Sequence, residues 1–188
     1  MNFICEGVDR LGKDSLIAGI KNALGFAIVL HRTKPEILQH YDNESRRLNV
    51  NPMLLYQRDC FAQDMAFIKA SELHDYRFIF NRSWIGEAVY AKMYRGYSGD
   101  YVFDLEKIAG IDTVKNTRLI LLTEDFISSN HFVDDGLSLG TSDKRAHEQH
   151  LFTAAFNRSL IADKKIICVT GVDGKFRPKE DILKEALE

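Results

Sequence analysis

Short, mainly apolar runs alternate along this chain with longer segments in which apolar residues repeat at helical spacing. The five runs lie at residues 3–5, 26–30, 77–80, 119–122 and 166–169. Runs of this length and composition are typical of parallel strands that are buried on both faces. Parallel neighbours need a crossover connection, which is usually a helix. The alternation therefore predicts an α/β fold in which helices cover both faces of a central five-stranded parallel sheet, a three-layer sandwich.

The segments between the runs carry helix signals. Apolar residues repeat at helical spacing from residue 14 to residue 24, and Gly25 follows as a C-terminal cap. Pro52 precedes a second helical segment at residues 53–70. Further helices are expected at residues 84–94, around 151–159 and at 179–187.

Length and composition limit the class of protein. The chain has 188 residues, of which 45% are hydrophobic, and we expect one domain spanning residues 1–188. A formal net charge of -2 argues against a nucleic-acid polymer as partner. No apolar run approaches the roughly 20 residues that span a bilayer, so no membrane partner is expected. The N-terminal segment lacks the features of a signal peptide, and the three cysteines show no metal-like spacing. These features predict a cytoplasmic protein.

One polar stretch interrupts the alternation. Residues 124–143 contain Gly136 and Gly140 and are expected to form a mobile lid, with solvated carboxylates at Glu124 and Asp125.

The segment from Gly7 to Lys13 has the spacing G-x-x-x-x-G-K of a phosphate-binding loop. Glycines let backbone N–H groups close around phosphate oxygens, and the following helix directs its positive end at the anion. Lys13 would act as a point charge on the β- and γ-phosphates of ATP. In a parallel sheet this loop, Asn81-Arg82 and the segment after Leu122 share the rim at the carboxyl ends of the strands.

One position of the loop departs from the pattern. The usual Ser or Thr after the lysine, a ligand of Mg²⁺, is Asp14, and Ser15 comes one place later. A carboxylate is a good ligand for Mg²⁺, so Asp14 is the candidate metal residue, directly or through water. The alternative is a glycine turn that only joins strand to helix, with Asp14 as the N-cap.

The loop Glu6-Gly7-Val8-Asp9-Arg10-x-Gly12-Lys13 closely resembles that of thymidylate kinases, E-G-x-D-x-x-G-K. Other landmarks of that family follow in order along the chain: Arg32 with Pro35, Leu54-Leu55-Tyr56, and Asn81-Arg82-Ser83 followed by Tyr90. Residues 81–90 also resemble small phage-encoded relatives, for which the compartment would be the host cytoplasm. The resemblance implies a P-loop nucleoside monophosphate kinase fold and, by likeness alone, a possible homodimer.

The resemblance also implies roles for charged residues. Asp9 would accept a hydrogen bond from the deoxyribose 3′-hydroxyl, and Arg10 would neutralise charge on the transferring phosphoryl group. Arg82 would bind the 5′-phosphate of the acceptor, assisted by Arg32 and Arg58. An arginine after a strand is otherwise often only ion-paired or solvated.

Three aromatic residues are candidates for contacts with the acceptor nucleotide. Tyr56 and Phe61 could stack on the base, although aromatic residues on an amphipathic helix are more often part of the core. Tyr90 would pack against C2′ and exclude a ribose hydroxyl.

Asn81 stands where the family has aspartate. We hypothesise that the carboxylate lost there is compensated by the carboxylate gained at Asp14.

These features predict an enzyme that transfers the γ-phosphoryl of Mg·ATP to dTMP, with Mg²⁺ as cofactor. A broader deoxynucleoside monophosphate kinase, or a deoxynucleoside kinase, would keep the fold and change the acceptor. A nucleotide-binding protein with little turnover is the alternative from another class. The departures at Asp14 and Asn81 leave this binding-protein alternative open. Lys13, Arg10 and Arg82 argue against it, because binding alone does not need an arginine that stabilises the transition state.

Overall fold

A computed structural model describes residues 1–32, 52–125 and 142–188 of the chain. The strands are β1 (Asn2–Gly7), β2 (Ile28–His31), β3 (Phe78–Asn81), β4 (Thr117–Thr123) and β5 (Asp163–Cys168). They form one parallel sheet in the order β2-β3-β1-β4-β5. This confirms the predicted five-stranded parallel sheet.

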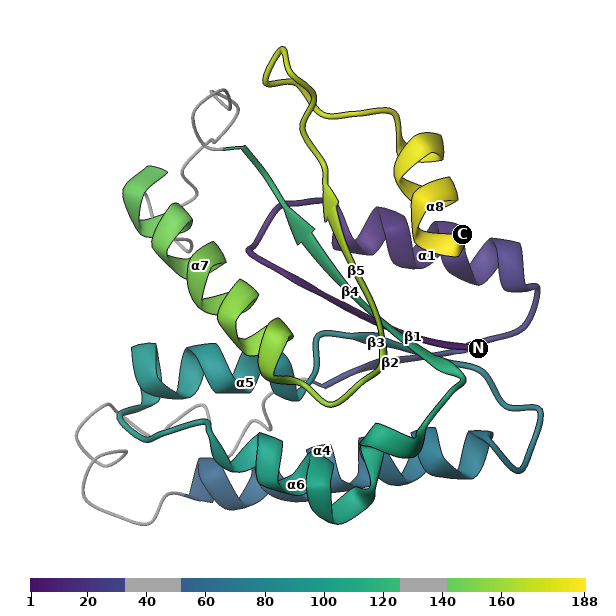
Figure 1. The fold of residues 1–188 in the computed structure, drawn as a ribbon, viewed down its shortest axis with the longest axis vertical. Coiled ribbons are helices and arrows are strands. Elements are labelled where there is room, and N and C mark those ends of the chain that lie inside the picture. The colour runs from purple at the N-terminus through teal and green to yellow at the C-terminus, as the bar shows by residue number, and fades with distance from the viewer. Residues whose placement is uncertain (33–51, 126–141) are drawn as a thin grey trace.

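The described helices are α1 (Lys13–Leu24), α4 (Pro52–Ser71), α5 (Trp84–Tyr90), α6 (Tyr101–Ala109), α7 (Ser142–Arg158) and α8 (Lys179–Leu187). Helices α1 and α8 pack together on one side of the sheet, and α5 and α7 pack together on the other (Figure 1). Helix α4 packs against α6, which also contacts α5. The predicted three-layer α/β sandwich is therefore correct.

The core follows from the apolar runs. Leu119 to Leu122 of β4 and Ile4 of β1 are fully buried, because these are central strands with helices on both faces. Strand boundaries differ from the sequence prediction by up to three residues, and the starts of the two edge strands show why. Phe26 is 65% exposed and precedes β2. Strand β5 begins earlier than predicted, at Asp163, because it pairs along its full length with β4 from Arg118.

Two helical features also differ. The predicted helix 84–94 is α5 followed by a π-helical turn, Ala91–Arg95. Helix α6 was not predicted.

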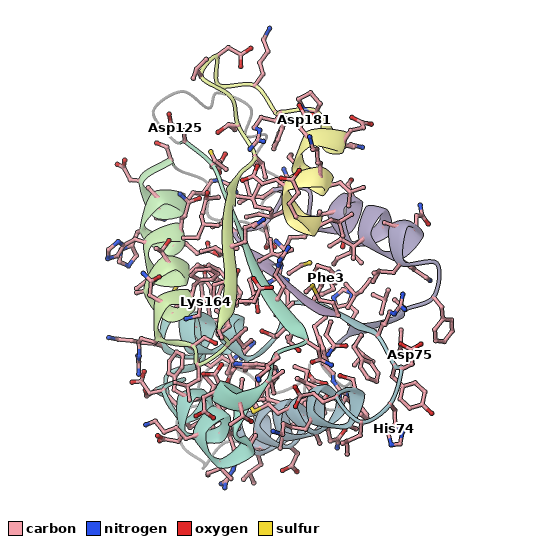
Figure 2. The ribbon with its side chains drawn as sticks, turned by 45° about the vertical axis from the view of Figure 1, so that its right-hand side comes forward. Phe3, His74, Asp75, Asp125, Lys164 and Asp181 are labelled. Carbon is pink, nitrogen blue, oxygen red and sulfur yellow. The ribbon has the colours of Figure 1, made fainter. Side chains whose placement is uncertain are left out.

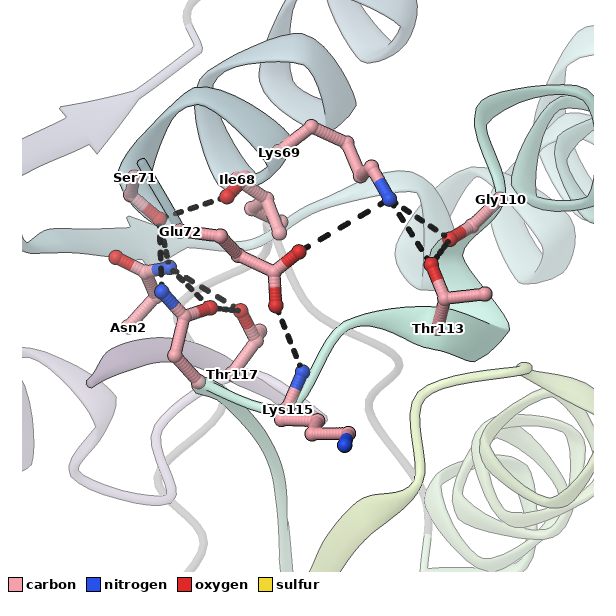
Figure 3. Close-up of polar contacts among 10 residues, drawn as sticks. Asn2, Ile68, Lys69, Ser71, Glu72, Gly110, Thr113, Lys115 and Thr117 are labelled. Atoms are coloured by element: carbon pink, nitrogen blue, oxygen red, sulfur yellow. Dashed lines mark hydrogen bonds and ion pairs between the residues drawn. The ribbon is translucent and has the colours of Figure 1, made fainter. Parts of the chain in front are cut away.

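The amino ends of the strands are joined by a polar cluster around Asn2 (Figure 3). The buried Asn2 amide donates from Nδ2 to Ser71 Oγ at 2.7 Å and to Thr117 Oγ1 at 3.1 Å. Its Oδ1 accepts the backbone N–H of Phe78 at 2.9 Å. The cluster thus connects β1, β4, the start of β3 and the end of α4, and satisfies buried polar groups.

The carboxyl ends of the strands lie at the opposite end of the molecule. In Figure 2, Asp125, which follows β4, lies at one end, and His74 and Asp75, which precede β3, lie near the other. The predicted phosphate loop follows β1 and belongs to the end marked by Asp125.

Candidate active site

The phosphate loop connects β1 to α1, as the sequence predicts. Gly7 adopts φ 139°, and a Cβ there would lie 2.6 Å from the carbonyl oxygen of Leu122. Gly12 adopts φ 82° and is the N-cap of α1, but a Cβ there would meet no atom within 4 Å. Gly7 is therefore required by the close approach of β4, whereas Gly12 is favoured only by its backbone conformation.

Lys13 is folded back onto the loop. Its Nζ donates to the carbonyl oxygens of Gly7 at 2.8 Å and Val8 at 2.7 Å. The residue is 7% exposed. Burial, and secondly the positive charge of Arg82, lower the pKa of Lys13 to about 8. The ammonium thus lies at the loop before α1, held by the backbone carbonyls of Gly7 and Val8.

Asp14 and Asn81 are in contact. The Asn81 Nδ2 donates to Asp14 Oδ1 at 2.8 Å, so the first turn of α1 is joined to the end of β3. Both residues line a cavity of about 360 Å³ over the loop. The residues around this phosphate-loop cavity are Asp9, Arg10, Gly12, Lys13, Asp14, Ser15, His31, Asn81 and Arg82.

Arg10 and Arg82 share an unusual backbone conformation. They are the non-glycine residues with positive φ in the described ranges, at 70° and 67°. This left-handed region costs an ordinary side chain about 1 kcal/mol or more, and such strain concentrates at functional sites. The Arg82 guanidinium pairs with Asp9 and lies 5.7 Å from the ring centroid of Tyr90. The folded chain thus places both arginines at the phosphate-loop cavity.

Glu6 holds the turn that carries Arg82. Its buried Oε1 accepts hydrogen bonds from the Ser83 N–H at 2.6 Å, the Ser83 hydroxyl at 2.7 Å and the Gly86 N–H at 3.2 Å. Burial raises the pKa of Glu6, and these hydrogen bonds oppose that rise. Glu6 belongs to the loop motif, but this role was not predicted from the sequence.

A second cavity, of about 380 Å³, adjoins the first. Its lining residues are His31, Arg32, Gln57, Phe61, Arg82, Ser83, Gly86, Glu87, Tyr90 and Arg95. Because His31 and Arg82 line both cavities, the two spaces meet at these residues. We call the second space the acceptor cavity.

The acceptor cavity contains four of the predicted nucleotide-binding residues. Phe61 is buried on α4 and also belongs to the core. The Tyr90 hydroxyl donates to Glu148 Oε1 at 2.6 Å. Burial raises the pKa of Tyr90, and the bond to Glu148 adds to that rise. Arg32 forms an ion pair of 2.6 Å with Asp64, a buried carboxylate of α4 that the sequence did not single out.

Two predicted residues are not brought to a described cavity. Arg58 is exposed and Tyr56 is half-buried, and neither lines the acceptor cavity, whereas the adjacent Gln57 does. Pro35 lies outside the described residues.

A third cavity, of about 640 Å³, lies between α1 and α8. Arg10, Gly12 and Ser15 line both it and the phosphate-loop cavity. Its other walls include Asn22 of α1, and Phe176, Arg177 and Leu183 near or in α8. The residue pattern does not indicate this space, because it depends on how two helices distant in the chain pack together.

The predicted lid at 124–143 falls mainly outside the described residues, which omit 126–141. Glu124 is not the solvated carboxylate that was expected. It is buried and pairs with Arg145 of α7 at 2.5 Å, and Arg145 Nη2 also donates to the carbonyl oxygen of Asp9 at 3.2 Å. Helix α7 is therefore attached to the phosphate loop.

Comparison with known proteins supports the fold. No protein-family model and no curated protein matches the sequence. Among solved structures, the YorR protein of Bacillus subtilis in complex with phosphorylated GDP is similar over 100% of this chain and 93% of its own, with a TM-score of 0.59 and 14% identity. The thymidylate kinase of Candida albicans is similar over 97% of this chain and 87% of its own, with a TM-score of 0.50 and 14% identity. The chain therefore has the P-loop nucleoside monophosphate kinase fold.

Two further observations concern metals and membranes. Within the described ranges, no three His, Cys, Asp or Glu residues are grouped so that they could hold a metal ion by themselves. No helix in the same ranges has the length and apolar character that crossing a bilayer requires.

Proposed function

We propose that this chain is a nucleotide kinase that transfers the γ-phosphoryl group of Mg·ATP to dTMP, giving dTDP and ADP. The observation that carries the proposal is the meeting of the phosphate-loop cavity and the acceptor cavity at Arg82 and His31. Two nucleotides bound in these spaces would have their phosphates next to each other. Such positioning, together with electrostatic stabilisation, supplies most of the catalysis in phosphoryl transfer.

The donor nucleotide would occupy the phosphate-loop cavity and the α1–α8 cavity, which share Arg10, Gly12 and Ser15. Its β- and γ-phosphates would accept hydrogen bonds from the loop backbone and from Lys13. To do so, Lys13 would exchange the carbonyl oxygens of Gly7 and Val8 for phosphate oxygens. The remainder of the nucleotide would extend between α1 and α8.

The residues present fit a magnesium ion. Mg²⁺ usually binds through one or two carboxylates together with substrate phosphates and water, rather than in an all-protein cage. Asp14 lines the phosphate-loop cavity with one carboxylate oxygen fixed by Asn81, and Ser15 is adjacent. A bound Mg²⁺ would neutralise charge on the phosphates, and Asp14 would hold the ion in position.

The acceptor phosphate would bind Arg82, whose planar guanidinium can contact two phosphate oxygens. One of these oxygens would attack the γ-phosphorus as the bond to the ADP leaving oxygen breaks. Arg10, at the border of both donor spaces, would stabilise negative charge on the transferring group. Asp9 would have to release Arg82 in part and could then accept a hydrogen bond from the sugar.

The alternatives differ in acceptor or in turnover. A broad deoxynucleoside monophosphate kinase would use the same phosphate contacts, and a deoxynucleoside kinase would not need Arg82 as a phosphate ligand. A binding protein with little turnover would bind both nucleotides without producing ADP. A homodimer is expected from the family likeness alone, and light scattering would measure it.

The test is ADP production from Mg·ATP with dTMP, dUMP, dGMP, dAMP, dCMP and thymidine offered separately. We expect turnover with dTMP and its abolition in Lys13→Ala with the fold retained, as circular dichroism would show. Turnover with all monophosphates would favour the broad kinase, and turnover with thymidine alone the nucleoside kinase. ATP binding without ADP production from any acceptor would contradict the proposal.

A further inference from the structure

The acceptor cavity shares only part of its lining with the phosphate-loop cavity. His31 and Arg82 mark the end that meets the phosphate-loop cavity. Gln57, Phe61 and Arg95 are among the residues that line the acceptor cavity but not the phosphate-loop cavity. If the proposed function holds and a nucleoside monophosphate binds with its phosphate at Arg82, its base extends toward these residues.

Arg95 is held in place by a buried carboxylate. It comes from the π-helical turn after α5, and its Nη1 pairs with Oε2 of Glu87, whose side chain is 1% exposed. The other oxygen, Oε1, accepts hydrogen bonds from the hydroxyls of Tyr97 at 2.6 Å and Tyr101 at 3.2 Å. Both carboxylate oxygens therefore have partners within the protein, and Glu87 serves to orient the arginine.

The guanidinium itself still reaches the cavity, since the Arg95 side chain is 23% exposed and lines it. A guanidinium carries five N–H donors and no acceptor. Its bond to Glu87 engages one terminal nitrogen, Nη1, and the side chain also hydrogen-bonds with Tyr97, which leaves further N–H groups of the five. The group can therefore offer donors to a ligand and cannot accept a hydrogen bond from one.

This property distinguishes two kinds of base. Thymine, uracil and guanine carry a carbonyl oxygen at the position where cytosine and adenine carry an amino group. A donor-only group binds the carbonyl oxygen and is left facing an N–H donor if the amino base enters. Phe61 offers an aromatic surface and Gln57 an amide beside it.

We propose that Arg95, positioned by Glu87, is a specificity-determining residue that selects nucleotides with a carbonyl on this edge of the base. The proposal rests on the proposed function, because it takes the acceptor monophosphate as the occupant of the cavity. It extends that function by naming the substrate class, nucleotides with keto bases. It also names a residue, Arg95, that lies outside the segments that resemble thymidylate kinases.

Binding of monophosphates in the absence of ATP, measured by calorimetry, tests the proposal independently of turnover. We expect the unmodified chain to bind dTMP, dUMP and dGMP at least about tenfold more tightly than dCMP and dAMP. Arg95→Gln should weaken dTMP binding to about the level of dCMP and leave dCMP nearly unchanged, because an amide can donate or accept. Equal affinity for both classes, or an equal loss for both in Arg95→Gln, would overturn the proposal.

Arg95→Gln leaves the buried Glu87 without its cation and could destabilise the fold. The double variant Glu87→Gln with Arg95→Gln removes that charge and should lose the discrimination while melting near the unmodified protein. Glu87→Gln alone should reduce the discrimination without abolishing it, because Arg95 remains but is held less firmly. Discrimination that survives in the double variant would overturn the proposal.

The same panel separates the two proposals. Suppose that monophosphates bind, that Arg82→Gln weakens their binding, and that the protein shows no preference for keto bases. This result would contradict the role of Arg95 and leave the proposed function standing. If no monophosphate binds, both the acceptor assignment and the inference built on it are wrong.

Discussion

Asn81 at the end of β3 donates a hydrogen bond to Asp14 in the first turn of α1, with 2.8 Å between Nδ2 and Oδ1. The two positions at which the sequence departs from the thymidylate-kinase pattern are thus in direct contact. Aspartate at position 81 would put two carboxylates together, and like charges at this distance repel. The amide at 81 is therefore the partner that a carboxylate at 14 requires.

This contact predicts strong coupling between the two positions. Asn81→Asp alone should weaken Mg·ATP binding by tenfold or more, because of carboxylate repulsion beside the phosphates. Asp14→Ser together with Asn81→Asp should recover much of that loss, since the hydroxyl can donate to the new carboxylate. Titration of ATP binding against Mg²⁺ concentration measures both, with a coupling of about 0.5–3 kcal/mol expected. Losses that simply add would contradict this.

The lowered pKa of Lys13 predicts pH-dependent nucleotide binding. Its pKa of about 8 lies below the ordinary value of 10.5, so the free protein loses this charge as the pH rises through about 8. Phosphates favour the charged form, so ATP binding above that pH takes up a proton and weakens by up to about tenfold per pH unit.

Calorimetry at pH 9 in buffers of different ionisation enthalpy measures the proton taken up. Lys13→Arg is the matched control, because arginine stays charged throughout this range. The Lys13→Arg variant should bind ATP without taking up a proton. If the variant takes up as much of a proton as the unmodified protein, the proton binds to a group other than Lys13.

The two glycines of the phosphate loop should respond differently to alanine. Gly7→Ala places a Cβ 2.6 Å from the Leu122 oxygen and should lower the free energy of unfolding by roughly 3 kcal/mol or more. It should also abolish ATP binding. Gly12→Ala meets no atom within 4 Å, so only its positive φ opposes it, at about 1 kcal/mol. Urea unfolding of both variants gives the comparison, and equal losses would show that contact with β4 is not what requires Gly7.

Glu6 should stabilise the turn that carries Arg82. Glu6→Ala leaves two backbone N–H groups and the Ser83 hydroxyl without their buried acceptor, and should cost about 2–4 kcal/mol of unfolding free energy. Glu6→Gln keeps one acceptor oxygen and should lose less. A larger loss in the glutamine variant than in the alanine variant would contradict this role.

Much of the fold could be predicted because its signals are local. The central strands are short apolar runs, and the phosphate loop is a fixed spacing of glycines and a lysine between a strand and a helix. Edge strands were placed less well. The ends of β2 and β5 are set by pairing with β3 and β4, which the sequence does not display.

Helix α6, Tyr101–Ala109, was not predicted, and its place in the fold depends on a buried charge. Glu106 accepts hydrogen bonds from Trp84 Nε1 at 2.6 Å, Ser159 Oγ at 2.6 Å and the Leu160 N–H at 2.7 Å. Acidic residues on helices are usually solvated, so the pattern of residues alone does not indicate a buried one.

The same reason explains what was missed in the candidate site. The phosphate loop could be named from its spacing, and Asn81 and Arg82 from their place after a predicted strand and from a family resemblance. Asp64 and Glu87, which hold Arg32 and Arg95, could not, because their burial depends on partners brought together only by folding.

The α1–α8 cavity has a consequence for the order in which the protein matures during synthesis. Its walls come from residues 10–22 and from residues 176–183, which meet where Leu183 packs on Gly19. A ribosome releases the second set well after the first, and contacts between distant segments form slowly. In a nascent chain the phosphate loop and the residues that line the acceptor cavity would therefore be available well before the α1–α8 cavity could close.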